Sequence, residues 1–142
     1  MEIETSGSTS AFTGRSRSIS TTLTQFDLPS LIEKMKDSRS WKKGELKTLT
    51  LLNVPGRQIV LTAIHEGTEI DSFQTCDSIT LQIVEGRILF RTSKEVKFLD
   101  EGQALTLFDN IKYSFTARAE TVVIITLANC TLGMKNIRYP GI

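Results

Sequence analysis

From residue 45 onward, apolar and polar residues alternate, and this period of two limits the fold more than any other feature of the sequence. The clearest runs lie at 79–83 and 111–117, where every second residue is apolar. Such a period is typical of strands that bury one face. Turn residues interrupt the runs about every 8 to 12 positions, which is the pattern of an all-β sandwich or barrel.

The expected elements follow from these runs and their turns. A short helix begins around Asp27-Leu28-Pro29 and ends near Asp37, because its apolar residues recur at helical spacing. The turn Glu85-Gly86-Arg87 joins two strands that we expect to pair as a hairpin, and 132–142 is expected to be an irregular extension. We expect about eight strands, enough for two curved sheets of jelly-roll type, at 46–52, 58–65, 79–84, 88–90, 95–99, 104–108, 112–117 and 121–127.

The length of 142 residues fits one domain. Residues 1–25 contain six Ser and six Thr with few apolar side chains, so we expect a flexible N-terminal segment, and a single domain at 26–142. This segment is interpreted as a leader or as a strand ordered by a partner subunit. The alternative is a phosphorylation region at Arg15-Ser16-Arg17-Ser18, where arginines would face the added charge.

The charge balance and the scarce cysteines exclude several classes of function. Seventeen Lys and Arg against sixteen Asp and Glu give a net charge of +1, so no nucleic-acid partner is expected. No apolar run approaches the roughly 18 residues of a membrane span, and no signal-type segment is recognised. We therefore expect a cytoplasmic protein with no membrane contact. Cys76 and Cys130 lie far apart and are predicted to be free thiols.

Two further features concern packing. The lone Trp41 follows the expected helix and is interpreted as a packing anchor. The run 122–125 is apolar on both faces of its strand, so both faces must be covered, one by the facing sheet and the other by a partner subunit or the N-terminal segment. We expect a homodimer.

Two stretches of the sequence resemble the motifs of the small single-domain cupins. The first is Gly67 to Gly86, with the strand and turn at 79–87, and the second is Gly102 to Ala117, entered through Leu99-Asp100-Glu101-Gly102. The likeness covers roughly residues 45 to 128. It implies a cupin-type double-stranded β-helix, an RmlC-like jelly-roll barrel, with one short N-terminal helix.

Metal-binding cupins carry two His and a Glu in the first motif and a His in the second. Carried onto this sequence, the Glu position falls on Ile79 and the second-motif His on Tyr113. The first two His positions fall on Phe73 and Thr75, or on Ser72 and Gln74 if the gap is one residue longer. None of these residues is a His or a carboxylate, so the chain is interpreted as a degenerate member with no metal site and no cofactor.

The favoured hypothesis is a metal-free cupin used as a small-molecule-binding, structural or regulatory module, without catalytic residues. A small organic ligand would then lie in the barrel against Phe73, Thr75, Ile79, Gln82, Phe90, Tyr113 and Phe115. These side chains could instead fill the barrel completely. One alternative is a metal-independent sugar-type epimerase with His65 as base and Tyr113 as acid. Another is a metal-dependent oxygenase. The lone His65 is otherwise expected to be a structural or surface residue.

Overall fold

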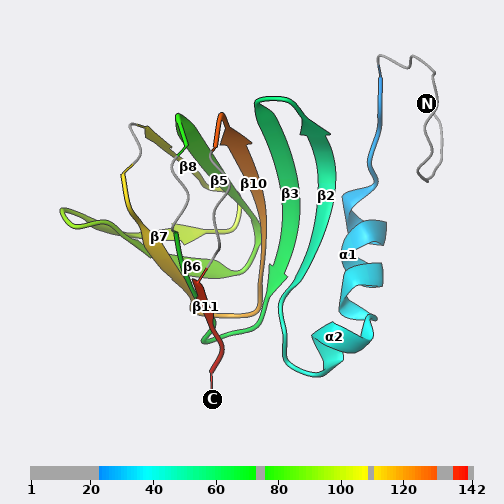
Figure 1. Cartoon of the computed structure of the whole chain (residues 1–142). Helices are drawn as coiled ribbons and strands as arrows, with labels where there is room; N and C mark the ends of the chain where they lie inside the picture. Colours follow the sequence, from blue (N-terminus) through cyan, green and yellow to red (C-terminus); the bar gives the residue numbers. More distant parts are fainter. Residues whose placement is uncertain (1–22, 73–75, 109–110, 131–135, 141–142) are drawn as a thin grey trace. The chain divides into compact units, whose positions relative to one another are not determined.

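The computed structural model describes residues 23–72, 76–108, 111–130 and 136–140 (Figure 1). The chain divides into two compact units, Met1–Glu33 and Lys34–Ile142. In the first unit, the amide of Leu31 donates to the carbonyl of Asp27 over 3.1 Å, and the hydroxyl of Ser30 donates to the Asp27 carboxylate over 2.9 Å. These two bonds satisfy groups at the start of helix α1 (Leu28–Lys36), which confirms the predicted helix.

A second helix, α2 (Arg39–Lys42), follows within the larger unit and was not expected from the sequence. Ser38 begins it, because the Ser38 hydroxyl accepts the amide of Trp41 over 3.3 Å. Trp41 is buried at 7% exposure, which confirms its predicted role as a packing anchor. No helix among the described segments is long and apolar enough to cross a membrane.

The larger unit is built from two five-stranded antiparallel sheets, as expected for a jelly roll. Sheet one has the order β2-β3-β10-β5-β8. Strand β10 is its centre, pairing with β3 on one side and β5 on the other. The strands of this sheet are β2 (Lys47–Val54), β3 (Arg57–Ile64), β5 (Ser78–Glu85), β8 (Ala104–Phe108) and β10 (Thr121–Ala128).

Sheet two has the order β11-β4-β9-β6-β7. Its strands are shorter: β4 (Glu69–Asp71), β6 (Arg87–Arg91), β7 (Val96–Asp100), β9 (Ser114–Ala117) and β11 (Asn136–Arg138). Strands β4 and β11 were not predicted, and the expected irregular extension at 132–142 instead supplies β11, which pairs with β4. The described residues thus hold ten strands rather than about eight.

The hairpin predicted at 85–87 is wrong. β5 belongs to sheet one and β6 to sheet two, so the chain changes sheets at Gly86 instead of folding back on itself. Gly86 has a φ of +96°, and a Cβ there would collide with the backbone of Glu120 and Thr121. A single glycine in this conformation makes a corner too sharp for any other residue.

The core lies between the two sheets and confirms the period of two. Alternate residues of β5 are buried, and Phe90 and Phe115 come from facing positions of β6 and β9. Val122 and Val123, predicted to be covered on both faces, are fully buried within the chain itself, while Ile124 and Ile125 are half-buried.

Cys76 and Cys130 form a disulfide, so the prediction of free thiols is wrong. Each lies two residues beyond the paired ends of β5 and β10, where Ser78 faces Ala128. The amide of Asp77 donates to the carbonyl of Ala128 over 2.9 Å and brings the two cysteines opposite each other, with their Cα atoms 3.9 Å apart. The sequence separation of the two cysteines did not indicate this bond, because they come together only when β5 pairs with β10.

Candidate functional site

The barrel interior is the place where this fold would hold a ligand. Ile79 is 5% exposed, Phe90 3% and Phe115 1%. The Tyr113 ring lies between the two aromatic residues, with its centroid 5.4 Å from that of Phe90 and 6.4 Å from that of Phe115. The structure therefore brings four of the predicted residues into one apolar cluster.

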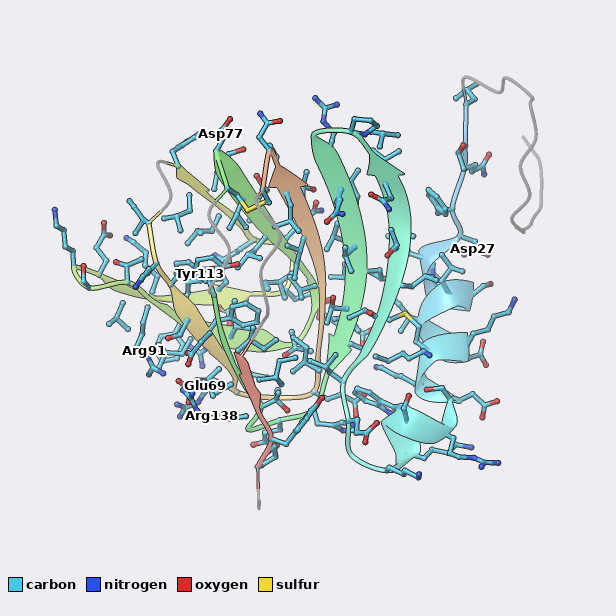
Figure 2. The ribbon with its side chains drawn as sticks, viewed as in Figure 1. Asp27, Glu69, Asp77, Arg91, Tyr113 and Arg138 are labelled. Carbon is cyan, nitrogen blue, oxygen red and sulfur yellow. A yellow bond between two sulfur atoms is a disulfide. The ribbon has the colours of Figure 1, made fainter. Side chains whose placement is uncertain are left out.

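Tyr113 is the one member of these four with a polar side-chain atom. It is half-buried and lies just before β9 (Figure 2). Burial raises the pKa of its phenol, and a hydrogen bond with Ser72 partly offsets that rise. The phenol therefore stays protonated at neutral pH and can donate a hydrogen bond inside the cluster.

Gln82 is not part of the interior. It is exposed, and its neighbours Leu81 and Ile83 point into the core. Because successive side chains of a strand point to opposite faces, Gln82 lies on the outer face of sheet one. The two remaining predicted residues, Phe73 and Thr75, lie outside the described residues.

The donor set at the described motif positions does not fit a divalent metal. Ile79 and Tyr113 occupy the positions at which metal-binding cupins carry a carboxylate and an imidazole, and neither supplies such a ligand. In the part of the chain that the structure describes, no group of three or more His, Cys, Asp or Glu could hold a metal ion.

His65 has a structural role beside α2. Its Nε2–H donates to the carbonyl of Trp41 over 2.8 Å, because a carbonyl can only accept. The imidazole also stacks on the Trp41 indole. The interpretation of His65 as a hydrogen-bonded structural residue is confirmed.

The structure does not bring His65 and Tyr113 together. The amide of Gly67, two residues after His65, bonds to Ala117 at one end of β9, whereas Tyr113 precedes the other end. Four residues of strand, about 13 Å, separate these ends. An acid and a base must both reach one bound substrate, and this arrangement does not provide that.

A charged cluster on the outer face of sheet two was not found from the sequence. The Oε2 atom of Glu69 forms ion pairs with Arg91 at 3.1 Å and with Arg138 at 3.0 Å. Arg138 also forms an ion pair with Asp71 at 2.7 Å. Figure 2 shows Glu69, Arg91 and Arg138 gathered on these strands. The hydrogen bonds to Asp71 and Glu69 raise the pKa of Arg138. The two carboxylates balance the two guanidinium groups, so these ion pairs link β4, β6 and β11 to one another.

An open groove of about 410 Å³ lies between the start of β8 and the end of β7. Its apolar walls come from Phe98, Leu99 and Leu105, and Lys97 and Gln103 are its polar members. In the described part of the chain, each of these two strands is the last strand of its sheet.

Comparison with known proteins identifies the fold. No protein-family profile matches the sequence, and no curated protein matches it. Among solved structures, a cupin-superfamily protein of Desulfitobacterium hafniense is similar with a TM-score of 0.57 at 10% identity, over 60% of this chain and 78% of that one. An RmlC-like cupin of Shewanella frigidimarina gives a TM-score of 0.53 at 17% identity, over 60% and 77%.

A larger structure shares the same architecture. Salicylate 1,2-dioxygenase of Pseudoaminobacter salicylatoxidans gives a TM-score of 0.62 at 11% identity, over 82% of this chain and 37% of that one. The chain therefore has the cupin fold, an all-β jelly roll, and the resemblance seen in the sequence motifs is confirmed for the fold. Cupins perform many unrelated chemistries on this framework, so function is argued from the residues.

Proposed function

We propose that this chain is a cupin-fold binding module that works without a barrel metal and as a homodimer. The observation that carries the proposal is the aromatic cluster of Phe90, Tyr113 and Phe115 inside the barrel, which offers apolar walls and the hydroxyl of the half-buried Tyr113. Walls of this kind with a single oriented polar group are typical of sites for small organic molecules.

The chemistry of the cluster defines the class of ligand. A protonated phenol donates a hydrogen bond, and the described interior residues Ile79, Phe90 and Phe115 offer no charge to pair with an ionised group. A small, neutral, aromatic molecule with one carbonyl acceptor fits these groups. Phe73 and Thr75 are proposed to complete the site. If the side chains close the interior entirely, the module is structural or regulatory instead.

The location of the protein is part of the proposal. A cytoplasmic location was expected from the sequence, and it remains a prediction. The Cys76–Cys130 disulfide favours an oxidising compartment, because such bonds persist mainly outside the reducing cytosol.

Acetophenone is a suitable first probe, since it is neutral, aromatic and carries one acceptor. We expect chemical-shift changes in Phe90 and Phe115 on titration, and binding about 5-fold weaker in Tyr113→Phe, the effect of one hydrogen bond. Gln82→Ala, on the outer face of the same barrel, is the matched control. If Tyr113→Phe binds acetophenone with the native affinity, the phenol does not contact the ligand. If neither Phe90 nor Phe115 shifts on titration, the interior does not bind this ligand and the structural or regulatory role is favoured.

Metal analysis tests the other half of the proposal. The purified protein is expected to contain no stoichiometric transition metal after dialysis against buffer without chelator. One bound metal per chain would overturn the metal-free reading and favour the oxygenase class.

A further inference from the structure

Strand β8 is an unprotected edge of sheet one. Its residues Ala104–Phe108 include neither a charged residue nor a proline, and in the described part of the chain it pairs with β5 on one side alone. Natural proteins usually block such an edge with lysine, proline or a covering loop. Strand β7, the neighbouring edge of sheet two, carries Lys97 and Asp100.

Several exposed apolar side chains lie on or next to β7 and β8. Phe108 is 59% exposed, Val96 60% and Phe98 49%, and Ile111 shortly after β8 is 45% exposed. The open groove between β7 and β8 lies among them. The Arg87 guanidinium lies over the Phe98 ring at 4.1 Å from its centroid, so Phe108 is the exposed ring on β8 itself. Exposed apolar side chains beside a groove are typical of an interaction site.

The backbone of β8 is oriented for strand addition. The amide of Ile83 donates to the carbonyl of Gln103 over 2.9 Å, so Gln103 faces β5, and the alternation continues with Leu105 and Leu107 opposite Leu81 and Ile79. Because backbone groups of successive residues point to opposite sides of a strand, Ala104, Thr106 and Phe108 direct their N–H and C=O groups to the free edge.

We propose that β8 pairs with β8 of a second copy of this chain, antiparallel about a two-fold axis at Thr106. This inference rests on the homodimer of the proposed function and assigns its interface. In this register Thr106 faces its own equivalent and Ala104 faces Phe108 of the other copy. A short side chain thus lies opposite a large exposed ring at both ends of the interface, and the uncharged strand meets itself without like-charge repulsion.

A stable dimer needs more buried area than the pairing of the two β8 strands alone provides. A specific interface buries about 800 Å² on each partner, more than five residues of an edge strand cover. The exposed ring of Phe108, and the groove that Ala104 and Leu105 line, extend the contact surface of β8. Sheet one of the first copy and sheet one of the second copy would then join into one continuous sheet across the axis.

A charge placed at the axis tests the register. In sedimentation velocity the native chain is expected to be a dimer, and Thr106→Lys is expected to raise the dissociation constant at least about tenfold, because two lysines would face each other. Thr50→Lys is the matched control, since Thr50 is an exposed residue on β2 at the opposite edge of the same sheet. Thr106→Val should stay dimeric, and circular dichroism checks that each variant folds.

A cysteine at the axis gives a second readout. Both native cysteines are in the disulfide, so Thr106→Cys adds one thiol. Paired Cα atoms at the axis would be about 5.5 Å apart, within the range of a disulfide. Mild oxidation should link Thr106→Cys into a covalent dimer and leave Thr50→Cys monomeric on a denaturing gel.

The outcomes separate the interface from the proposed function. A dimer that neither Thr106→Lys nor Thr106→Cys affects overturns the β8 interface and leaves the homodimer standing. A native monomer overturns both.

Discussion

The Nζ atom of Lys36 lies 2.7 Å from Oε2 of Glu120, and this ion pair joins the last turn of α1 to the loop before β10. The same Nζ reaches Glu85 at the end of β5 at 2.8 Å. The ammonium group therefore links the helical segment to the end of β5 and to the residue before β10. The Lys36 side chain is 23% exposed.

Lys36→Met is expected to lower the free energy of unfolding by about 1 kcal/mol at neutral pH, the upper end for partly exposed pairs. Burial lowers the pKa of Lys36, but its bonds to Glu120 and Glu85 outweigh this and raise it above 10.5. The stabilisation is therefore complete below that value and is lost as pH rises through the raised pKa. Urea unfolding at several pH values measures it. Lys42→Met, in a more exposed pair with Asp37, is the control.

The stacked pair of Trp41 and His65 gives a second prediction. Their ring centroids are 3.5 Å apart with an interplanar angle of 19°, and Trp41 is the single tryptophan of the chain. Trp41→Ala should cost about 3 to 5 kcal/mol, as usual for removal of a buried large aromatic. Val54→Ala, at an exposed side chain of β2, should stay within about 0.5 kcal/mol. Equal losses in chemical denaturation would contradict the buried role of Trp41.

Reduction of the disulfide should destabilise the barrel strongly. Cys76 and Cys130 are 54 positions apart, and closing a loop of that length stabilises by about 4 kcal/mol in the chain-entropy model. Urea midpoints with and without reductant measure the loss. The double variant Cys76→Ala/Cys130→Ala should have the stability of the reduced chain and no response to reductant. Two alkylatable thiols in the denatured, unreduced protein would rule out the bond.

Tyr113 should ionise above the ordinary tyrosine pKa of 10.0, because burial disfavours the phenolate. The near-ultraviolet absorbance change that accompanies formation of the phenolate follows the titration. Since the chain has two tyrosines, the native curve minus that of Tyr113→Phe isolates this residue. Stability linked to Tyr113 is fully present below 10.0 and falls as pH rises through the raised value. If the midpoint of this difference curve lies at or below the ordinary value of 10.0, the Tyr113 phenol is exposed to water and the prediction is wrong.

The sequence predicted the long strands well because each carries several periods of alternation. It missed β4 and β11, because three residues are too few to show a period. Gly86 was recognised as a turn, but local residues cannot show whether the next strand stays in the same sheet. The hairpin was therefore wrong, although the strands on both sides of Gly86 were right.

The candidate site was predictable only in part. The alternation that buried Ile79 also required Gln82 to face outward, so that error could have been avoided from the sequence. The stacking of Phe90 on Tyr113 and the Cys76–Cys130 bond depend on pairing between distant strands. No local pattern carries such information, since loop closure brings these residues together only when the sheets form.

The position of β10 at the centre of sheet one also dictates when this chain can fold during its synthesis. Its two neighbours, β3 and β5, are both translated earlier and have no central strand to join until residues 121–128 have left the ribosome. Until then β3 can pair only with β2, and β5 only with β8, so one edge of each of these apolar strands stays open. Sheet one is therefore completed late, when β10 joins the two pairs of strands, and shortened products that end before Thr121 are expected to depend on chaperones.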